Sequence, residues 1–169
     1  MTMKIFGLAG WSGSGKTTLI VKLIPELVGR GFSVSTMKHA HHDFDIDKPG
    51  KDSHDHRQAG ASEVMISASQ RWALMHELRG AEEPSVDELI ARMSPVDLLL
   101  VEGFKWHAYP KMEIHRPSVG KPLLQTDDAE IIAVACDEDI TGLSVPVLNL
   151  DDISGIADFI VDRCSLKAA

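Results

Sequence analysis

The sequence predicts a three-layer α/β fold, with a mostly parallel sheet, helices on both faces and an antiparallel edge hairpin. Short apolar runs alternate with amphipathic segments at helical spacing, as in sheets that are buried on both faces. A glycine-rich loop joins the first apolar run to the first amphipathic segment. Two runs in the middle of the chain are joined by a short turn, which suggests the hairpin. All 169 residues are expected to form a single domain, because a chain of that length can bury one stable core without disulfides or a structural metal ion.

The first elements are expected to form a βαβ unit. Residues 3–9 are apolar and end in glycines, which predicts a buried strand. Residues 17–29 carry leucine, isoleucine and valine at helical spacing, and Pro25 is expected to kink this helix or mark its last turns. Residues 32–37 alternate and are partly β-branched, which predicts the second strand. The crossover between the two strands is expected to be right-handed.

The later elements are predicted by the same periodicities. A polar loop is expected over residues 39–53, and the helix near Glu88 has Ser85 as its N-cap in a capping box. The predicted helices cover residues 55–60, 85–93 and 152–164, and the predicted strands cover residues 63–68, 72–78, 96–101, 111–115, 131–135 and 145–150.

Composition excludes several classes of protein. The net charge of −8 argues against a protein that coats nucleic acid or binds membranes through a basic surface. No stretch approaches the roughly eighteen apolar residues of a membrane span, and the N-terminal run is too short for a signal peptide. Cys136 and Cys164 lie far apart and form no metal-type pair. A cytoplasmic location is expected.

Residues 10–17 match the Walker A pattern G-x-x-x-x-G-K-[ST] in full. Glycines let successive backbone N–H groups point at one anion, and the following helix adds its positive end. Lys16 is expected to reach the β- and γ-phosphates and Thr17 to ligate Mg²⁺. A dinucleotide site is the alternative for this glycine-rich turn, but Gly-Lys-Thr at the helix start favours a nucleoside triphosphate. The expected binding residues are Gly10, Trp11, Ser12, Gly13, Ser14, Gly15, Lys16, Thr17 and Thr18.

Phosphoryl chemistry also needs an acid near the end of a neighbouring strand, to hold the Mg²⁺. Glu102 follows four consecutive apolar residues and precedes a glycine, so we predict it as this acid. Asp45 and Asp47 are weaker alternatives. The alternative for Glu102 is an ordinary solvent-exposed glutamate at a strand end, which is common.

The polar loop after the second strand is unusual, because residues 38–47 hold three histidines and three aspartates. Three interpretations stay open: a switch-like loop that touches the γ-phosphate and Mg²⁺, a transition-metal site, or a solvated loop without a role. Its position beside residues 10–17, the predicted phosphate loop, favours the first interpretation. Lys51 is a candidate to neutralise a phosphate or an anionic partner, with Asp52 to orient it, whereas His54 and His56 are expected at the surface.

The base of the nucleotide is not determined by the residues. No Asn-Lys-x-Asp motif, which reads guanine, is present. Asp137 follows the strand predicted at 131–135 and is a candidate acceptor for hydrogen bonds from a purine edge. A backbone group would serve equally well.

Together these stretches resemble the molybdopterin-guanine dinucleotide biosynthesis protein B (MobB) family. The resemblance implies a cytoplasmic, homodimeric P-loop GTP-binding protein with weak GTPase activity, which assists the guanylyltransferase that joins GMP to molybdopterin. It implies that Gly10 to Thr18 bind the triphosphate, that Thr17 and Glu102 serve Mg²⁺, and that residues 41–52 shape the site or the face seen by molybdopterin or the partner enzyme. From the residues themselves, Lys16 and Glu102 are the predicted catalytic residues. The matching stretches are AGWSGSGKTTL, KHAHHDFDIDKPGKDS, RQAGA, SQRWALM and LLLVEGFK.

Two other functions are alternatives. A small-molecule or nucleotide kinase needs a mobile basic lid, whereas Arg57, Arg71, Arg79, Arg92 and Arg116 are scattered along the chain. A nickel-delivery GTPase shares the fold layout and often bears histidine-rich segments. Its cysteine-bearing metal motif is missing here, although His39, His41 and His42 keep a metal role open.

Overall fold

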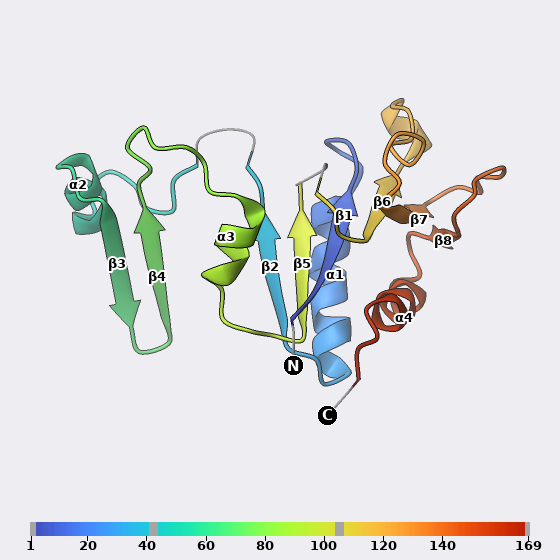
Figure 1. Cartoon of the computed structure of the whole chain (residues 1–169), viewed down its shortest axis with the longest axis horizontal. Helices are drawn as coiled ribbons and strands as arrows, with labels where there is room; N and C mark the ends of the chain where they lie inside the picture. The colour runs from blue at the N-terminus through green and yellow to red at the C-terminus, as the bar shows by residue number, and fades with distance from the viewer. Residues whose placement is uncertain (1–2, 41–43, 104–106, 168–169) are drawn as a thin grey trace. The chain divides into compact units, whose positions relative to one another are not determined.

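The computed structural model describes residues 3–40, 44–103 and 107–167 (Figure 1). Contacts divide the chain into two compact units. Unit 1 comprises Met1–His39 and Pro95–Ala169, and unit 2 comprises Ala40–Ser94, inserted between two strands of unit 1. The expectation of one domain from end to end therefore stays a prediction. None of the described helices is both long and apolar enough to span a membrane.

Unit 1 is built on a six-stranded sheet whose pairings are all parallel. Its order is β2-β5-β1-β6-β7-β8, which confirms the predicted fold class. The strands are β1 (Lys4–Ala9), β2 (Val34–Lys38), β5 (Leu98–Glu102), β6 (Lys111–His115), β7 (Ile131–Cys136) and β8 (Val147–Asn149), and the helices are α1 (Lys16–Gly29), the 3₁₀ turn η1 (Pro117–Val119) and α4 (Ile153–Arg163).

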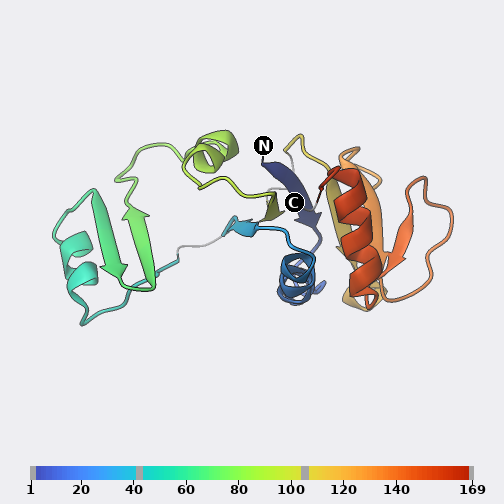
Figure 2. The same cartoon turned by 90° about the horizontal axis from the view of Figure 1, so that it is seen from below.

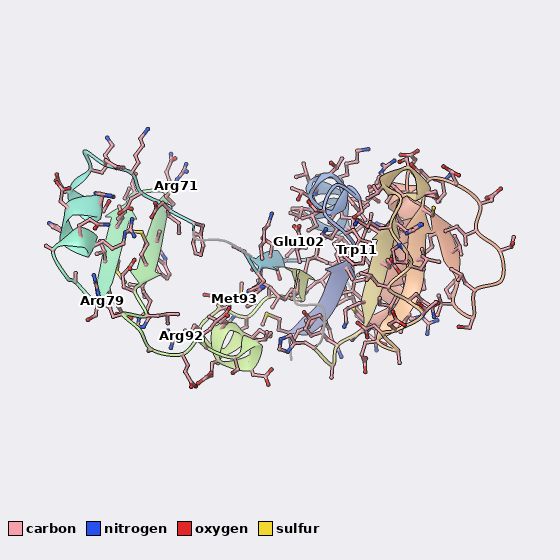
Figure 3. All side chains as sticks on the ribbon, turned by 90° about the horizontal axis from the view of Figure 1, so that it is seen from above. Trp11, Arg71, Arg79, Arg92, Met93 and Glu102 are labelled. Carbon is pink, nitrogen blue, oxygen red and sulfur yellow. The ribbon has the colours of Figure 1, made fainter. Side chains whose placement is uncertain are left out.

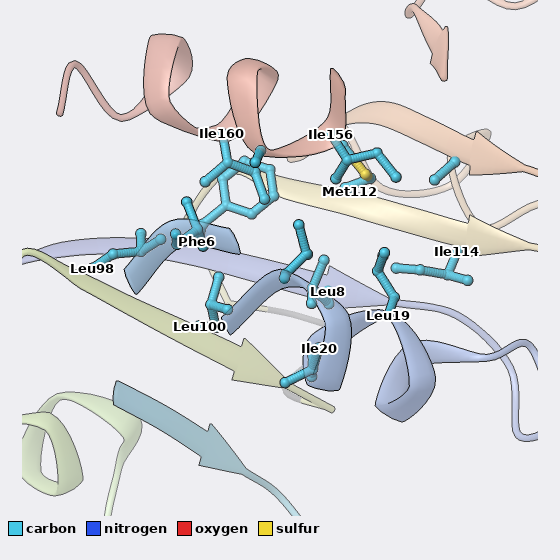
Figure 4. Close-up of a cluster of buried hydrophobic side chains, with 14 of the residues drawn as sticks. Phe6, Leu8, Leu19, Ile20, Leu98, Leu100, Met112, Ile114, Ile156 and Ile160 are labelled. Atoms are coloured by element: carbon cyan, nitrogen blue, oxygen red, sulfur yellow. The ribbon is translucent and has the colours of Figure 1, made fainter. Parts of the chain in front are cut away.

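The main core lies on one face of this sheet (Figure 4). Alternate strand residues such as Phe6, Leu8 and Leu100 point into it, as the period of two in a strand requires. Helix α1 buries Leu23 in this core and α4 buries Ile160. The two helices contact each other, so they lie on the same face of the sheet (Figure 2).

The opposite face differs in detail from the prediction of helices on both faces. Over β6, part of this face is covered by the irregular connection that leads to β7. Glu113 is fully buried there and accepts the backbone N–H groups of Leu124 and Gln125 at 2.9–3.0 Å. Lys111, also buried, donates to Asp128 at 2.6 Å. These polar contacts replace the apolar helix contacts that strand periodicity suggests.

Unit 2 holds a two-stranded antiparallel hairpin and two short helices. Helix α3 has the predicted capping box, in which Ser85 accepts from the backbone of Glu88 and Glu88 accepts from the backbone of Ser85. The hairpin was expected at an edge of the main sheet, but its strands form a separate sheet. Hairpin hydrogen bonds are local, whereas docking onto an edge depends on the long flanking connections. The elements are α2 (Asp52–Gln58), β3 (Glu63–Ala68), β4 (Arg71–His76) and α3 (Val86–Ala91).

Candidate functional site

The phosphate loop lies between the end of β1 and the start of α1, as predicted. Two of its glycines are required by their surroundings. A Cβ on Gly10, at φ 144°, would stand 2.5 Å from the carbonyl oxygen of Ile114. Gly15, at φ 99°, is the N-cap of α1 in the left-handed region that favours glycine. The loop therefore keeps its curled shape because side chains are absent at these positions.

Lys16 folds back across this loop. Its Nζ donates to the carbonyl oxygens of Gly10 at 2.9 Å and of Trp11 at 3.0 Å. Thr17 and Thr18 are exposed at the start of α1. The Ser14 hydroxyl is buried and has no hydrogen-bond partner among the described residues, and a phosphate held in the loop would supply an acceptor for it. The donors that surround the loop fit a polyphosphate.

Glu102 stands at the end of β5, the neighbour of β1 in the sheet (Figure 3). In the strand register it is paired with Leu8 of β1 and with Lys38 of β2. The side chain is largely buried, and one oxygen lies 3.8 Å from Nζ of Lys38. Because the strands are parallel, Glu102 and the phosphate loop share one edge of the sheet. Its carboxylate and the Thr17 hydroxyl are oxygen groups of the kind that Mg²⁺ prefers.

Sequence reasoning missed the role of Arg116, which it counted among scattered arginines. Arg116 follows β6, the other neighbour of β1. Its Nε donates to the carbonyl oxygen of Ser14 at 3.2 Å and lies 3.3 Å from the position that a Cβ of Gly15 would take. A second nitrogen of the guanidinium pairs with Asp137. The sequence does place Arg116 directly after a predicted strand. Only the strand order shows that this strand lies beside β1 and the phosphate loop.

Asp137, predicted as a reader of the base, therefore has a cationic partner in this structure. It follows β7 and is partly exposed beside Cys136, whose thiol pKa is raised by burial. Trp11 donates from Nε1 to the carbonyl oxygen of Pro122 at 2.8 Å. The connection after β6 thus contacts the phosphate loop at two positions, Trp11 and Ser14. A contact between Asp137 and a base stays a prediction.

The histidine and aspartate loop is described in part, because His41, His42 and Asp43 lie outside the described residues. In unit 2, Arg57 binds Asp45 and Asp47 at 2.7 Å each. These ion pairs explain why the pKa of Asp47 is lowered. Asp45 and Asp47 were weaker alternatives to Glu102 as the acid that holds Mg²⁺. In this structure both carboxylates are instead paired with the guanidinium of Arg57.

The remaining predicted residues of this loop are at the surface or on α2. Lys51 is the exposed N-cap of that helix, and Asp52 is its first residue. His54 lies 3.5 Å from Asp55, and His56 is exposed. Within the residues that the structure describes, no three histidine, cysteine or acidic side chains are grouped for a metal ion.

The other arginines do not form a lid within unit 2. Arg71 begins β4, whereas Arg79 lies beyond the end of that strand and donates to the backbone of Arg57 and Ala61 (Figure 3). Arg92 caps the end of α3. Their separation within the described part of this unit agrees with the scatter seen along the chain.

Comparison with known proteins places this geometry in context. Residues 5–137 match the model of the family described as molybdopterin guanine dinucleotide synthesis protein B. The molybdopterin-guanine dinucleotide biosynthesis adapter protein of Escherichia coli is 45% identical over 161 residues, which is 94% of this chain and 91% of that protein. The adapter protein of Haemophilus influenzae is 42% identical over 158 residues, with 92% and 86% covered.

Solved structures agree with the fold. A crystal structure of molybdopterin-guanine biosynthesis protein B is 27% identical, with a TM-score of 0.73, and covers 94% of this chain and 99% of its own. The crystal structure of Bacillus subtilis MobB has a TM-score of 0.74 at 23% identity, covering 99% and 100%. The second likeness concerns the fold alone.

Proposed function

Because this chain belongs to the molybdopterin guanine dinucleotide synthesis protein B family, we propose that it is a GTP-binding adapter of molybdenum cofactor biosynthesis. It assists the attachment of GMP to molybdopterin, in the cytoplasm, and hydrolyses GTP slowly. One observation carries this proposal: Lys16 lies across the phosphate loop, and Glu102 ends β5, the strand beside β1.

The residues divide the work between binding and hydrolysis. The N–H groups of residues 10–18 and the Lys16 ammonium would hold the triphosphate. Thr17 and Glu102 would hold Mg²⁺, whose chemistry there would be to neutralise phosphate charge. Lys16 must leave its loop carbonyls to reach those phosphates, an exchange of two neutral acceptors for charged ones that favours the bound state. Turnover is slow because Arg116 is engaged by Ser14 and Asp137, so it is not available as an arginine finger.

The proposed partners are the molybdopterin guanylyltransferase, molybdopterin and a second copy of this chain. Support for a homodimer comes from one face of the hairpin, where Met65, Trp72 and Leu74 are exposed. Alternate residues on paired antiparallel strands share a face, so the three form one apolar strip.

Nucleotide binding is tested with the Lys16→Ala variant and titration calorimetry. We expect the wild-type chain to bind GTP with Mg²⁺ more tightly than ATP, and the variant to lose about a hundredfold in affinity, because charge-assisted contacts to phosphate are strong. Lys22→Ala on the exposed side of α1 is the matched control. Unchanged GTP affinity in Lys16→Ala would contradict the assignment of the phosphate loop.

A further inference from the structure

The connection that follows β6 is bound to the phosphate loop by contacts of three kinds. Trp11 is the second residue of the loop and follows the end of β1 (Figure 3). Its Nε1 donates to the carbonyl oxygen of Pro122 at 2.8 Å. The Nζ of Lys121 lies 5.7 Å from the centre of the Trp11 ring, a cation–π contact. Arg116 donates to the carbonyl oxygen of Ser14. A backbone acceptor, an ammonium and a guanidinium of the connection therefore all meet the loop.

A buried carboxylate fixes this connection to the sheet. Glu113 of β6 is fully buried, and its two oxygens accept the backbone N–H groups of Leu124 and Gln125 at 2.9–3.0 Å. A carboxylate is costly to bury unless donors compensate its charge, so these bonds hold the backbone of the connection firmly in place. Lys121 lies in the sequence between Arg116 and Leu124. Its backbone is therefore held on both sides.

Lys121 is an exposed cation whose charge no carboxylate of the described ranges neutralises. Its ammonium contacts the face of the Trp11 ring instead. Arg116 differs from it, because the Arg116 guanidinium is paired with Asp137. In a protein whose net charge is −8, an uncompensated ammonium beside the phosphate loop is a group that a bound anion can use.

The position of Lys16 indicates which phosphates would lie nearest to Lys121. The Nζ of Lys16 donates to the carbonyl oxygens of Gly10 and Trp11 at 2.9 and 3.0 Å. In a Walker A loop this ammonium reaches the β- and γ-phosphates. The phosphates that replace the two carbonyls as its acceptors therefore lie near the first residues of the loop. Trp11 is one of these residues, and Lys121 lies over its ring.

Building on the proposed function, in which Lys16 binds a triphosphate, we propose that Lys121 contacts the terminal phosphate and makes the protein discriminate a nucleoside triphosphate from a diphosphate. Glu113 is the positioning residue that holds the backbone carrying this lysine. On binding, the ammonium exchanges the face of the Trp11 ring for charged phosphate oxygens, which are stronger partners. Because a diphosphate lacks the last phosphate, the contact strengthens the binding of the triphosphate alone.

The test compares the affinities for GTP and GDP, each with Mg²⁺, by calorimetry on the full chain. We expect Lys121→Ala to bind GTP about tenfold more weakly and GDP as the wild type does. Lys121→Arg keeps the charge and should retain most of the discrimination, whereas Lys22→Ala on α1 should change neither affinity. Equal weakening of GTP and GDP in Lys121→Ala would mean that the lysine only supports the shape of the loop through Trp11, and would overturn the proposal.

The role of Glu113 is tested in the same assay. Glu113→Gln sets an amide donor against backbone N–H donors, so the connection loses part of its anchor. We expect GTP affinity to fall severalfold more than GDP affinity, with no further loss of discrimination when Lys121→Ala is added. An equal loss for both nucleotides would overturn the positioning role. Circular dichroism checks that each variant is folded, and the variants of the exposed Lys121 decide the main proposal without Glu113→Gln.

The two levels of the proposal fail in different ways. A wild-type chain that binds neither nucleotide would overturn the proposed function and the role of Lys121 together. GTP binding that Lys121→Ala leaves unchanged would overturn the role of Lys121 alone.

Discussion

At the scale of single residues, the site depends on side chains whose partners lie far away in the sequence. Glu102 could be predicted from its own strand, because an acid after an apolar run is a local pattern. Arg116 could not, because its contacts with Ser14 and Asp137 span 102 and 21 positions. They follow from the placing of β6 beside β1 and β7. Periodicity predicts strands but not their order.

Glu102 is expected to matter more for hydrolysis than for binding. Glu102→Gln keeps the shape of the side chain but removes the charge that would hold Mg²⁺. We expect GTP turnover to fall about tenfold or more and the Mg²⁺ dependence to weaken, while GTP affinity changes little. Single-turnover hydrolysis measured against Mg²⁺ concentration checks this. Equal turnover in the variant would remove Glu102 from the site.

Arg116 is expected to position the phosphate loop. Arg116→Ala would free the carbonyl of Ser14 and leave Asp137 without its cation, so we expect GTP affinity to drop by about tenfold. Arg116→Lys keeps the charge but not the two-point contact and should give an intermediate loss. A double-mutant cycle with Asp137→Ala, read by calorimetry, measures their coupling. Additive effects would mean that the pair does not act as a unit.

At the scale of elements, agreement between sequence and structure is closest where the periodicity is strong. The strand predicted over 111–115 is β6 without change, and the hairpin strands lie within two residues of their expected bounds. The last strand is shorter than the predicted 145–150, because Pro146 has no N–H to donate to a ladder and β8 begins after it. Element ends depend on such single groups, which explains the small differences elsewhere.

Helix α1 should carry much of the stability of unit 1, because it joins the sheet to α4 through the core. Leu23 is fully buried there. Leu23→Ala is expected to lower the free energy of unfolding by about 2–5 kcal/mol, through lost burial and the cavity left behind. The same helix offers the control Val21→Ala, at an exposed position, with an expected change below about 0.5 kcal/mol. Urea denaturation followed by circular dichroism compares them; similar losses would contradict the described core.

At the scale of the whole molecule, the fold class was predictable but the division into two units was not. The residue pattern of a hairpin is the same at a sheet edge and in a separate sheet, so it does not show which of the two forms. Unit 2 is a separate compact unit because its residues contact one another, for example in the ion pairs of Arg57 with Asp45, Asp47 and Glu77. Such pairs leave no periodic pattern in the sequence.

The proposed homodimer is a property of the whole chain. If the apolar strip on the hairpin is the contact, Trp72→Ser should weaken the dimer by at least about tenfold, because buried aromatic residues dominate interfaces. Val28→Ser, at an exposed apolar position on α1, should leave the dimer unchanged. Sedimentation equilibrium over a range of concentrations measures both. A monomeric wild type would contradict the homodimer, and equal dimerisation of Trp72→Ser would exclude this strip.

The pairing of β2 directly with β5 has a consequence for modularity. The two strands flank unit 2 in the chain, yet their ladder is complete without any residue of it. A parallel crossover needs about a dozen residues, far fewer than those from Ala40 to Ser94. The sheet that carries the phosphate loop is thus self-contained, and we expect that unit 2 can be shortened or exchanged without a change in the strand order. Variation in unit 2 is therefore expected to leave the predicted phosphate loop and the strands beside it unchanged.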